Sequence, residues 1–236
     1  MRYDACMRDT LKILPVSLLA GLLLSGCGAR TAPPSATIDV PFTAQAPAGD
    51  WSEPWQNACE ETSIYMVSSF YADEPIKRDQ AIARIREILS VKNDKFRISK
   101  DESLETISAL IAELGLPWST RIVYDPTEEA LKKELSEGRP VIVPLYAPAL
   151  GNQYYGSIDP PDYHVLVLIG YDDAEGVFIV NDPGTRHGAG LRFPYATFMN
   201  AIHDLNAANY KAGKKAVLFT SENDWTQWFE GFDIAG

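Results

Sequence analysis

The chain has 236 residues, 46% of them hydrophobic and 22% charged, which are the proportions of an ordinary globular protein with the core of one domain. The net charge is −11, and no run of Lys and Arg follows any part of the chain. Nucleic acid is therefore excluded as the main partner, because phosphate binding needs concentrated positive charge.

Residues 1–26 predict a signal peptide. Basic side chains precede an apolar run at residues 13–24, which is shorter than the ~20 residues that span a membrane. The run closes with Leu-Ser-Gly-Cys at residues 24–27, which resembles the bacterial lipobox. This resemblance implies cleavage before Cys27 and lipid attachment to it. A plain secretory signal with an incidental cysteine is the alternative, and either Met1 or Met7 starts the precursor.

The residue after the cysteine is Gly28 and not Asp, which by the same resemblance implies an outer-membrane lipoprotein that faces the periplasm. Residues 27–37 contain small residues and Pro, so we expect the lipidated cysteine and a flexible tether there. One domain is expected at residues 38–221. The acidic, aromatic tail at 222–236 is expected to cap the core, with partner docking as the alternative.

The periodicity of the domain predicts mostly helices first and mostly strands last, which indicates an α+β fold. The pattern Asn57-x-x-Glu60 predicts a capping box at the first helix, and Asp101 and Thr127 are expected to cap two later helices. In chain order we expect an extended entry at 38–42, a loop at 43–55, helices at 58–71, 78–90 and 102–114, a strand at 118–124, a helix at 128–137, a strand at 141–146, a loop at 147–161, a hairpin of strands at 163–171 and 177–181, a helix at 195–205 and a strand at 216–219.

Cys59 is the candidate nucleophile. It is the only thiol left in the mature chain, because Cys6 departs with the signal and Cys27 carries the lipid, so no internal disulfide is possible. Its place at a helix start favours the thiolate through free N–H groups and the helix dipole, whereas the carboxylates of Glu60 and Glu61 oppose it. A buried structural cysteine is the alternative.

The candidate base is one of three histidines. His164 opens an apolar strand, His187 lies in a Gly-rich loop, and His203 lies in the expected helix at 195–205. No His-Glu-x-x-His pattern, paired Cys or phosphate-binding loop is present in the sequence, so we expect neither a metal nor a nucleotide cofactor.

The geometry of the hairpin favours His164. If the turn is centred on Ala174, His164 faces Gly184, and Asp182 lies diagonally across from it on the same face. A base held by a third polar group is the arrangement that nucleophilic catalysis requires. Asn181 would point to the opposite face, and a slip of one residue would exchange the two roles.

Four segments in order resemble a known family. They are Val-Pro-Phe-Thr-Ala-Gln at 40–45, Ala-Cys-Glu-Glu-Thr-Ser at 58–63, Asp-Tyr-His-Val-Leu-Val at 162–167 and Asn-Asp-Pro at 181–183. Over about residues 38–220 the chain resembles the bacteriocin-leader (double-glycine) peptidase-like branch of the papain-like cysteine peptidases. The resemblance implies a papain-like fold, with the nucleophile at a helix start packed on a C-terminal antiparallel sheet.

The same resemblance implies the roles of the site residues. Cys59 is the nucleophile, His164 the base and Asp182 the orienting acid. The oxyanion donor is Gln45, which fits the Val-Pro-x-x-x-Gln pattern but lies fourteen residues before the cysteine, with the nearer Gln56 as the alternative. The pair Glu-Glu after the cysteine replaces the Gly-Pro common in the family.

These observations predict a cysteine peptidase or amide hydrolase at the bacterial cell envelope, with an acyl-enzyme mechanism and a peptide or protein substrate. The alternatives are a hydrolase or transpeptidase of peptidoglycan peptides with the same triad, and a non-catalytic surface-binding lipoprotein. The loop at 147–161 ends beside the expected base. We therefore expect Tyr154 and Tyr155 to line the substrate cleft.

Overall fold

A computed structural model describes residues 32–98, 100–155 and 161–223. Cys27 and the signal peptide, and residues 224–236 of the tail, lie outside the described residues. The described chain has helices followed by an antiparallel sheet, so the predicted α+β fold is confirmed. The elements are β1 (Ser35–Thr37), a 3-10 turn (Trp55–Asn57), α1 (Cys59–Tyr71), α2 (Arg78–Phe96), α3 (Leu104–Glu113), β2 (Trp118–Tyr124), α4 (Glu128–Ser136), β3 (Val141–Tyr146), α5 (Ala147–Leu150), β4 (Tyr163–Asp172), β5 (Val177–Asn181), β6 (Leu191–Pro194), α6 (Tyr195–Ala201), a second 3-10 turn (Tyr210–Ala212) and β7 (Ala216–Glu222).

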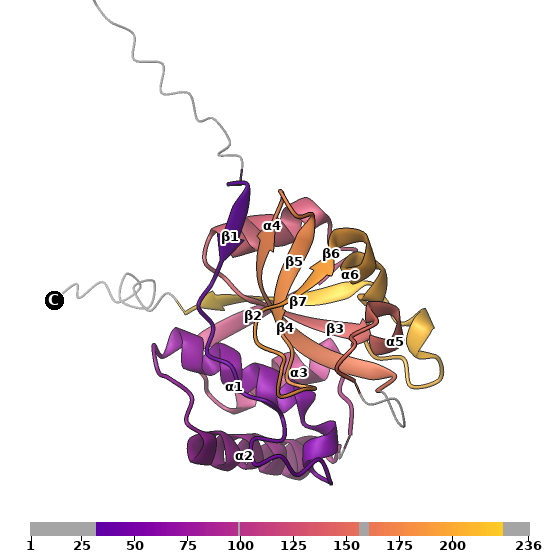
Figure 1. Ribbon diagram of the computed structural model, residues 1–236. Helices are drawn as coiled ribbons and strands as arrows, with labels where there is room; N and C mark the ends of the chain where they lie inside the picture. Colours follow the sequence, from indigo (N-terminus) through magenta and orange to yellow (C-terminus); the bar gives the residue numbers. More distant parts are fainter. Residues whose placement is uncertain (1–31, 99, 156–160, 224–236) are drawn as a thin grey trace, which may run out of the picture. The chain divides into compact units, whose positions relative to one another are not determined.

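The sheet has seven strands in the order β2-β7-β3-β4-β5-β6, with β1 paired to β4. β3 pairs with β4 as far as Leu168, and β1 pairs with the next part of β4, at Gly170–Asp172. Helices α1, α2 and α3 lie together below the strands in Figure 1, and α4 and α6 lie above them. The central strand β4 therefore meets both groups of elements, and it carries the candidate base.

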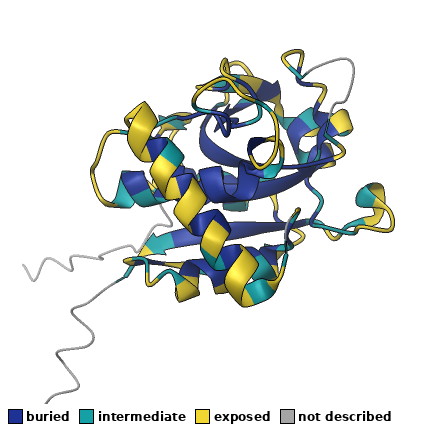
Figure 2. Ribbon diagram, turned by 90° about the horizontal axis from the view of Figure 1, so that it is seen from below, coloured by how far each residue is buried: buried dark blue, intermediate teal, exposed yellow. Residues whose placement is uncertain are grey.

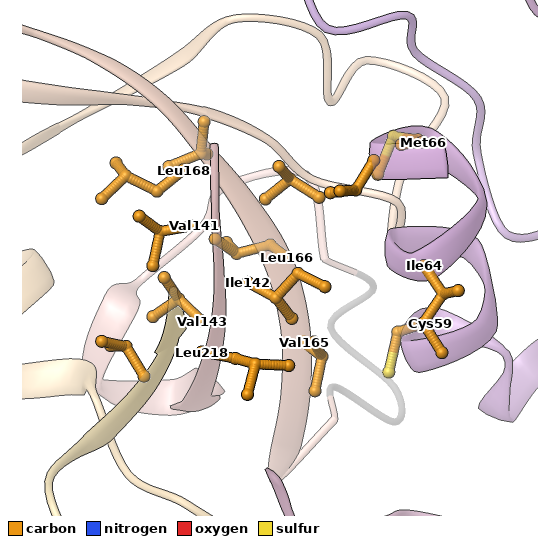
Figure 3. Packing of buried hydrophobic residues seen from close by; sticks show 14 of the residues in the cluster. Cys59, Ile64, Met66, Val141, Ile142, Val143, Val165, Leu166, Leu168 and Leu218 are labelled. Atoms are coloured by element: carbon orange, nitrogen blue, oxygen red, sulfur yellow. The ribbon is translucent and has the colours of Figure 1, made fainter. Parts of the chain in front are cut away.

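The core is built on strands β3 and β4, whose residues are almost all buried because apolar β-branched and Leu side chains fill both faces. α1 packs on β4, and in Figure 3 the side chain of Cys59 projects from α1 toward Val165 of that strand. Figure 2 shows the buried strands enclosed by helices whose outer surfaces are exposed. Among the described residues, no helix has the length and apolar character needed to cross a bilayer.

The bounds of several strands match the sequence prediction. The bounds of β2, β3 and β5 are those predicted, and Thr127 caps α4 by accepting a hydrogen bond from the backbone N–H of Ala130 at 3.1 Å. The inner end of the β4–β5 hairpin pairs Val167 with Asn181, which is the predicted register, but the tip pairs Asp172 with Val177, so the turn is centred between Ala174 and Glu175 and not on Ala174. A bulge between Leu168 and Gly170 then shifts the outer end of the hairpin by one residue.

Other bounds differ because tertiary contacts decide them. Ser35–Thr37, expected to be part of the tether, forms β1, which approaches β4 closely at Gly170: a Cβ there would lie 2.5 Å from the carbonyl oxygen of Ala36. α6 ends at Ala201 because Ile202 bridges to Leu145 of β3. The expected loop at 147–161 begins with the short helix α5, strand β6 was not predicted, and α2 and β7 extend beyond their expected ends.

Two predicted helix caps are wrong. The side-chain amide of Asn57 donates to Glu53 Oε1 at 2.6 Å, and α1 begins at Cys59 after Ala58, which makes no side-chain cap. α3 begins after Ser103, whose hydroxyl accepts from a backbone N–H, and not after Asp101. The capping box fails because Glu60 turns into the protein interior instead of back to the helix start.

Candidate active site

His164 and Asp182 are brought together by the hairpin. His164 is the second residue of β4, and Asp182 directly follows β5. His164 Nε2 lies 2.7 Å from Asp182 Oδ1, and the two side chains are 2% and 0% exposed. Because an ionised carboxylate only accepts hydrogen bonds, Nε2 carries the proton and Nδ1 is the nitrogen free to act as a base.

Asp182 is held as a carboxylate by several donors. Its Oδ2 accepts from Asn152 Nδ2 at 2.7 Å and from the Tyr155 hydroxyl at 2.8 Å, and its Oδ1 accepts from the backbone N–H of Gly184 at 2.8 Å. Burial opposes ionisation of this group, but His164 and these hydrogen bonds hold its pKa below the ordinary value. The acid beside the imidazole is therefore charged at neutral pH.

Asn181 points elsewhere. Its amide donates to the carbonyl oxygen of Val40 at 2.8 Å, and its Oδ1 accepts from the backbone N–H of Gly190 at 3.1 Å. It thus fastens the entry segment and the loop after Asp182. Of the two neighbours, the structure places Asp182 against His164.

Cys59 is the first residue of α1 and is 4% exposed. One turn along, the hydroxyl of Ser63 donates to the carbonyl oxygen of Val165 at 3.3 Å, which ties α1 to the residue next to His164. The Cys59 thiol donates to Glu60 Oε2 at 3.0 Å. Burial first, and then the charge and hydrogen bond of Glu60, raise the pKa of the Cys59 thiol well above its usual value. In this arrangement the helix start is outweighed, and the thiol keeps its proton.

Glu60 belongs to a buried cluster of charged side chains. Lys92 Nζ lies 2.5 Å from Glu61 Oε1 and 2.6 Å from Glu102 Oε1, and the backbone N–H of Glu102 donates to Glu60 Oε1 at 3.2 Å. All four side chains are at most 1% exposed. Burial and the neighbouring carboxylates raise the pKa of Glu60 to about 7 and that of Glu102 to about 12. Sequence reasoning missed this cluster.

Gln45, the predicted oxyanion donor, is buried beside the turn that precedes Cys59. Its Nε2 donates to the carbonyl oxygens of Trp55 and Gln56, both at 2.9 Å, and its backbone N–H donates to Pro183 at 2.9 Å. Both amide protons are engaged, so in this geometry Gln45 holds the turn against the loop after Asp182. The alternative, Gln56, has an exposed side chain. The oxyanion role of either residue stays a prediction.

The two predicted cleft tyrosines differ in position. Tyr155 is part of the acid–base assembly: its hydroxyl contacts Asp182, and its ring lies edge-on to the His164 ring with centroids 5.4 Å apart. Tyr154 is 44% exposed, and its ring centroid lies 5.3 Å from that of His187. Tyr154 is therefore the more accessible of the two, and the prediction that both tyrosines line the substrate cleft stays a prediction. The contacts of Tyr155 and Asn152 with Asp182 carry no sequence signal, because they come from an irregular loop.

The third histidine, His203, follows α6, where its Nδ1 lies 3.2 Å from the carbonyl oxygen of Ala201. Within the described part of the chain, no three His, Cys, Asp or Glu side chains are grouped so as to hold a metal ion.

A groove of about 480 Å³ lies beside the Gln45 loop. Its lining includes Phe42, Trp51, Ile76, Arg78 and Arg186.

Comparisons with known proteins concern the family and the fold. The model of the Peptidase_C39 like family matches residues 37–216. A solved structure from Bacillus anthracis, described as a C39-like peptidase, is similar with a TM-score of 0.51 and 17% identity, over 80% of this chain and 99% of that chain. Xylellain, a cysteine protease from Xylella fastidiosa, is similar with a TM-score of 0.48 and 11% identity, over 81% of this chain and 87% of that chain. The comparison with curated proteins gave no match.

The family match covers most of the described domain and includes Cys59, His164 and Asp182. The Bacillus anthracis structure shows that the same fold is adopted over nearly its whole length. The chain therefore belongs to the Peptidase_C39 like family and is a cysteine-type peptidase.

Proposed function

We propose that the protein hydrolyses peptide or amide bonds through an acyl-enzyme in which Cys59 is the nucleophile, His164 the general base and acid, and Asp182 the orienting acid. The observation that carries this proposal is the buried 2.7 Å contact between His164 Nε2 and Asp182 Oδ1, on the strand against which Cys59 packs. A fixed imidazole with a free Nδ1 is the group that a thiol nucleophile requires.

In the proposed reaction, His164 Nδ1 takes the thiol proton and the Cys59 sulfur bonds to the carbonyl carbon. The backbone N–H of Cys59, at the start of α1, stabilises the oxyanion together with a side-chain amide. Gln45 is the candidate for this amide if one of its N–H groups gives up its present hydrogen bond to a backbone carbonyl. The protonated imidazole then gives its proton to the leaving amine. Water attacks the thioester with His164 as base, and the free thiol returns.

We further propose that the enzyme acts at the cell envelope through a lipid on Cys27. The lipobox resemblance at residues 24–27 supports this location. Cys27→Ser is expected to block lipid labelling and to leave uncleaved precursor. If this variant is processed and partitions into detergent as the wild type does, the proposal that Cys27 carries the lipid is wrong.

The envelope location makes peptidoglycan peptides a second substrate class for the same triad. The third reading is a surface lipoprotein of this peptidase family that has lost its activity, and the one observation in its favour is the buried, protonated thiol of Cys59. The three readings differ in the reactivity of Cys59 and in the products formed.

The test is covalent labelling of the mature protein with a peptidyl acylating inhibitor, located by mass spectrometry. We expect labelling at Cys59 that is lost in His164→Ala and strongly reduced in Asp182→Ala. A digest of purified peptidoglycan, compared with a peptide library, then assigns the substrate class. Absence of labelling at every pH, or labelling unchanged by His164→Ala, contradicts the enzymatic proposal.

A further inference from the structure

The carboxyl group of Glu60 directly contacts the reacting sulfur. Glu60 Oε2 lies 3.0 Å from Cys59 Sγ, and its other oxygen accepts from the backbone N–H of Glu102 at 3.2 Å. The side chain is 0% exposed, so no bulk solvent separates the carboxyl from the thiol. Whether Glu60 carries a proton therefore decides which of the two groups donates this hydrogen bond.

An ionised Glu60 is incompatible with a thiolate at this distance. Two adjacent anions in a buried site repel each other strongly, because the interior screens charges poorly. A protonated Glu60 has the opposite effect, since its O–H can donate to the sulfur anion, and hydrogen bonds to anions are the stronger kind.

The surroundings make the protonated form accessible near neutral pH. Lys92, the cation of the buried cluster, already contacts the carboxylates of Glu61 and Glu102. Burial and the nearby carboxylates raise the pKa of Glu60 to about 7. The titratable and charged groups that face Glu60 come from α1, α2, the segment before α3 and β4, and they are Cys59, Glu61, Lys92, Asp101, Glu102 and Tyr163.

We propose that Glu60 is a further catalytic residue, which in its protonated form donates a hydrogen bond to the Cys59 thiolate and so permits the ion pair with His164. The inference rests on the proposed function, in which Cys59 is the nucleophile. The thiol proton moves to His164 Nδ1, Glu60 keeps its own proton, and the sulfur anion accepts from the Glu60 hydroxyl. When Glu60 loses its proton, the thiol donates to the carboxylate and the nucleophile is switched off.

The experiment is the pH dependence of Cys59 alkylation by iodoacetamide in the full mature chain. For the wild type we expect the rate to fall about fivefold between pH 7 and pH 8, because about half of Glu60 is protonated at its pKa of about 7 and only about a tenth one pH unit above it. An ordinary thiol shows the reverse, since its thiolate fraction increases with pH. A wild-type rate that rises steadily through this range overturns the proposal without any variant.

Glu60→Gln supplies a permanent N–H donor without a charge. We expect its rate to match the wild type near pH 5.5 and to exceed it about tenfold at pH 8. The matched control is Glu102→Gln, which removes a carboxyl group from the same buried cluster and keeps the backbone N–H that contacts Glu60. Its rate should still fall with pH, because Glu60 still titrates. A purely structural role of Glu60 would lower stability without changing the shape of the profile, so a Glu60→Gln profile parallel to the wild type overturns the proposal.

His164→Ala separates this inference from the proposed function. If His164→Ala removes alkylation below pH 8 while Glu60→Gln behaves as the wild type, the triad stands and the role of Glu60 is wrong. If His164→Ala has no effect at any pH, the proposed function itself fails.

Discussion

Lys92→Met is expected to destabilise the fold strongly at neutral pH. Lys92 lies on α2 with no exposed side-chain surface, and its ammonium contacts Glu61 and Glu102 at 2.5 and 2.6 Å. Methionine keeps most of the buried volume, so the change chiefly removes the charge. Removing one partner of a buried ion pair leaves an uncompensated carboxylate and costs about 3–5 kcal/mol of unfolding free energy.

The effect of pH on the free energy of unfolding has a definite sign. The pKa of Glu60 is raised in the folded state to about 7, so its contribution to stability is present below the unfolded pKa of 4.5 and is lost as the pH rises through about 7. Lys92 lowers the pKa values of Glu60 and Glu102, and without it both rise further. The carboxylates of the variant then take up protons more readily as the pH falls. The difference in unfolding free energy between Lys92→Met and the wild type is therefore smaller at pH 5.5 than at pH 7.5.

The assay is urea unfolding of the mature protein at both pH values, with Lys95→Met as the matched control. Lys95 lies on the same helix, 2.5 Å from Glu113, but the two side chains are 58% and 39% exposed. An exposed pair contributes about 0–1 kcal/mol, so the control should lose little. If Lys92→Met costs no more than Lys95→Met at pH 7.5, the reasoning about the buried cluster is refuted.

Three further predictions concern the acid beside the imidazole. Tyr155→Phe removes a donor that lowers the pKa of Asp182, so the acid limb of the turnover profile should move to higher pH; an unmoved limb contradicts this. Asp182→Ala should reduce turnover strongly with little loss of thermal stability. Asn181→Ala should instead cost about 1–3 kcal/mol of stability, because it leaves buried backbone groups without a partner, and it should reduce turnover less. Thermal melts and turnover rates of both variants test this contrast. Gly184→Ala should lower kcat, because the added Cβ would lie 2.8 Å from His164 Cε1. If the variant keeps the kcat of the wild type, the loop at Gly184 shifts to accommodate the methyl group.

Much of the fold was predictable because its signals are local. Uninterrupted apolar runs predicted the bounds of β3 and β5. The register assumed for the hairpin put Asp182 beside His164, and it holds at the inner end because the bulge offsets a turn that is centred half a residue further along. The cap of α4 at Thr127 needed only the side chain and the first turn of the helix. Each of these features depends on residues within one element or one hairpin.

The rest depends on partners that are distant in the sequence. Glu60 fits a capping box, yet it turns inward because a backbone N–H forty-two residues later and the neighbouring thiol bind it. Lys92 looks like a solvated residue at the end of an amphipathic helix, but two carboxylates from other segments draw it inside and α2 continues past it. Periodicity cannot reveal such contacts, because the same residue types are usually exposed.

If Cys27 carries a lipid, as proposed, strand β1 limits how far the domain can move from the membrane. Ser35 is paired to Asp172 of β4, and it lies eight positions after Cys27, with seven residues between the two. A fully extended chain covers at most about 3.6 Å per residue, so the eight steps from Cys27 to Ser35 reach at most about 29 Å. With a lipid on Cys27, the domain that carries His164 would stay close to the bilayer. A substrate deeper in the cell wall would then have to diffuse to the enzyme.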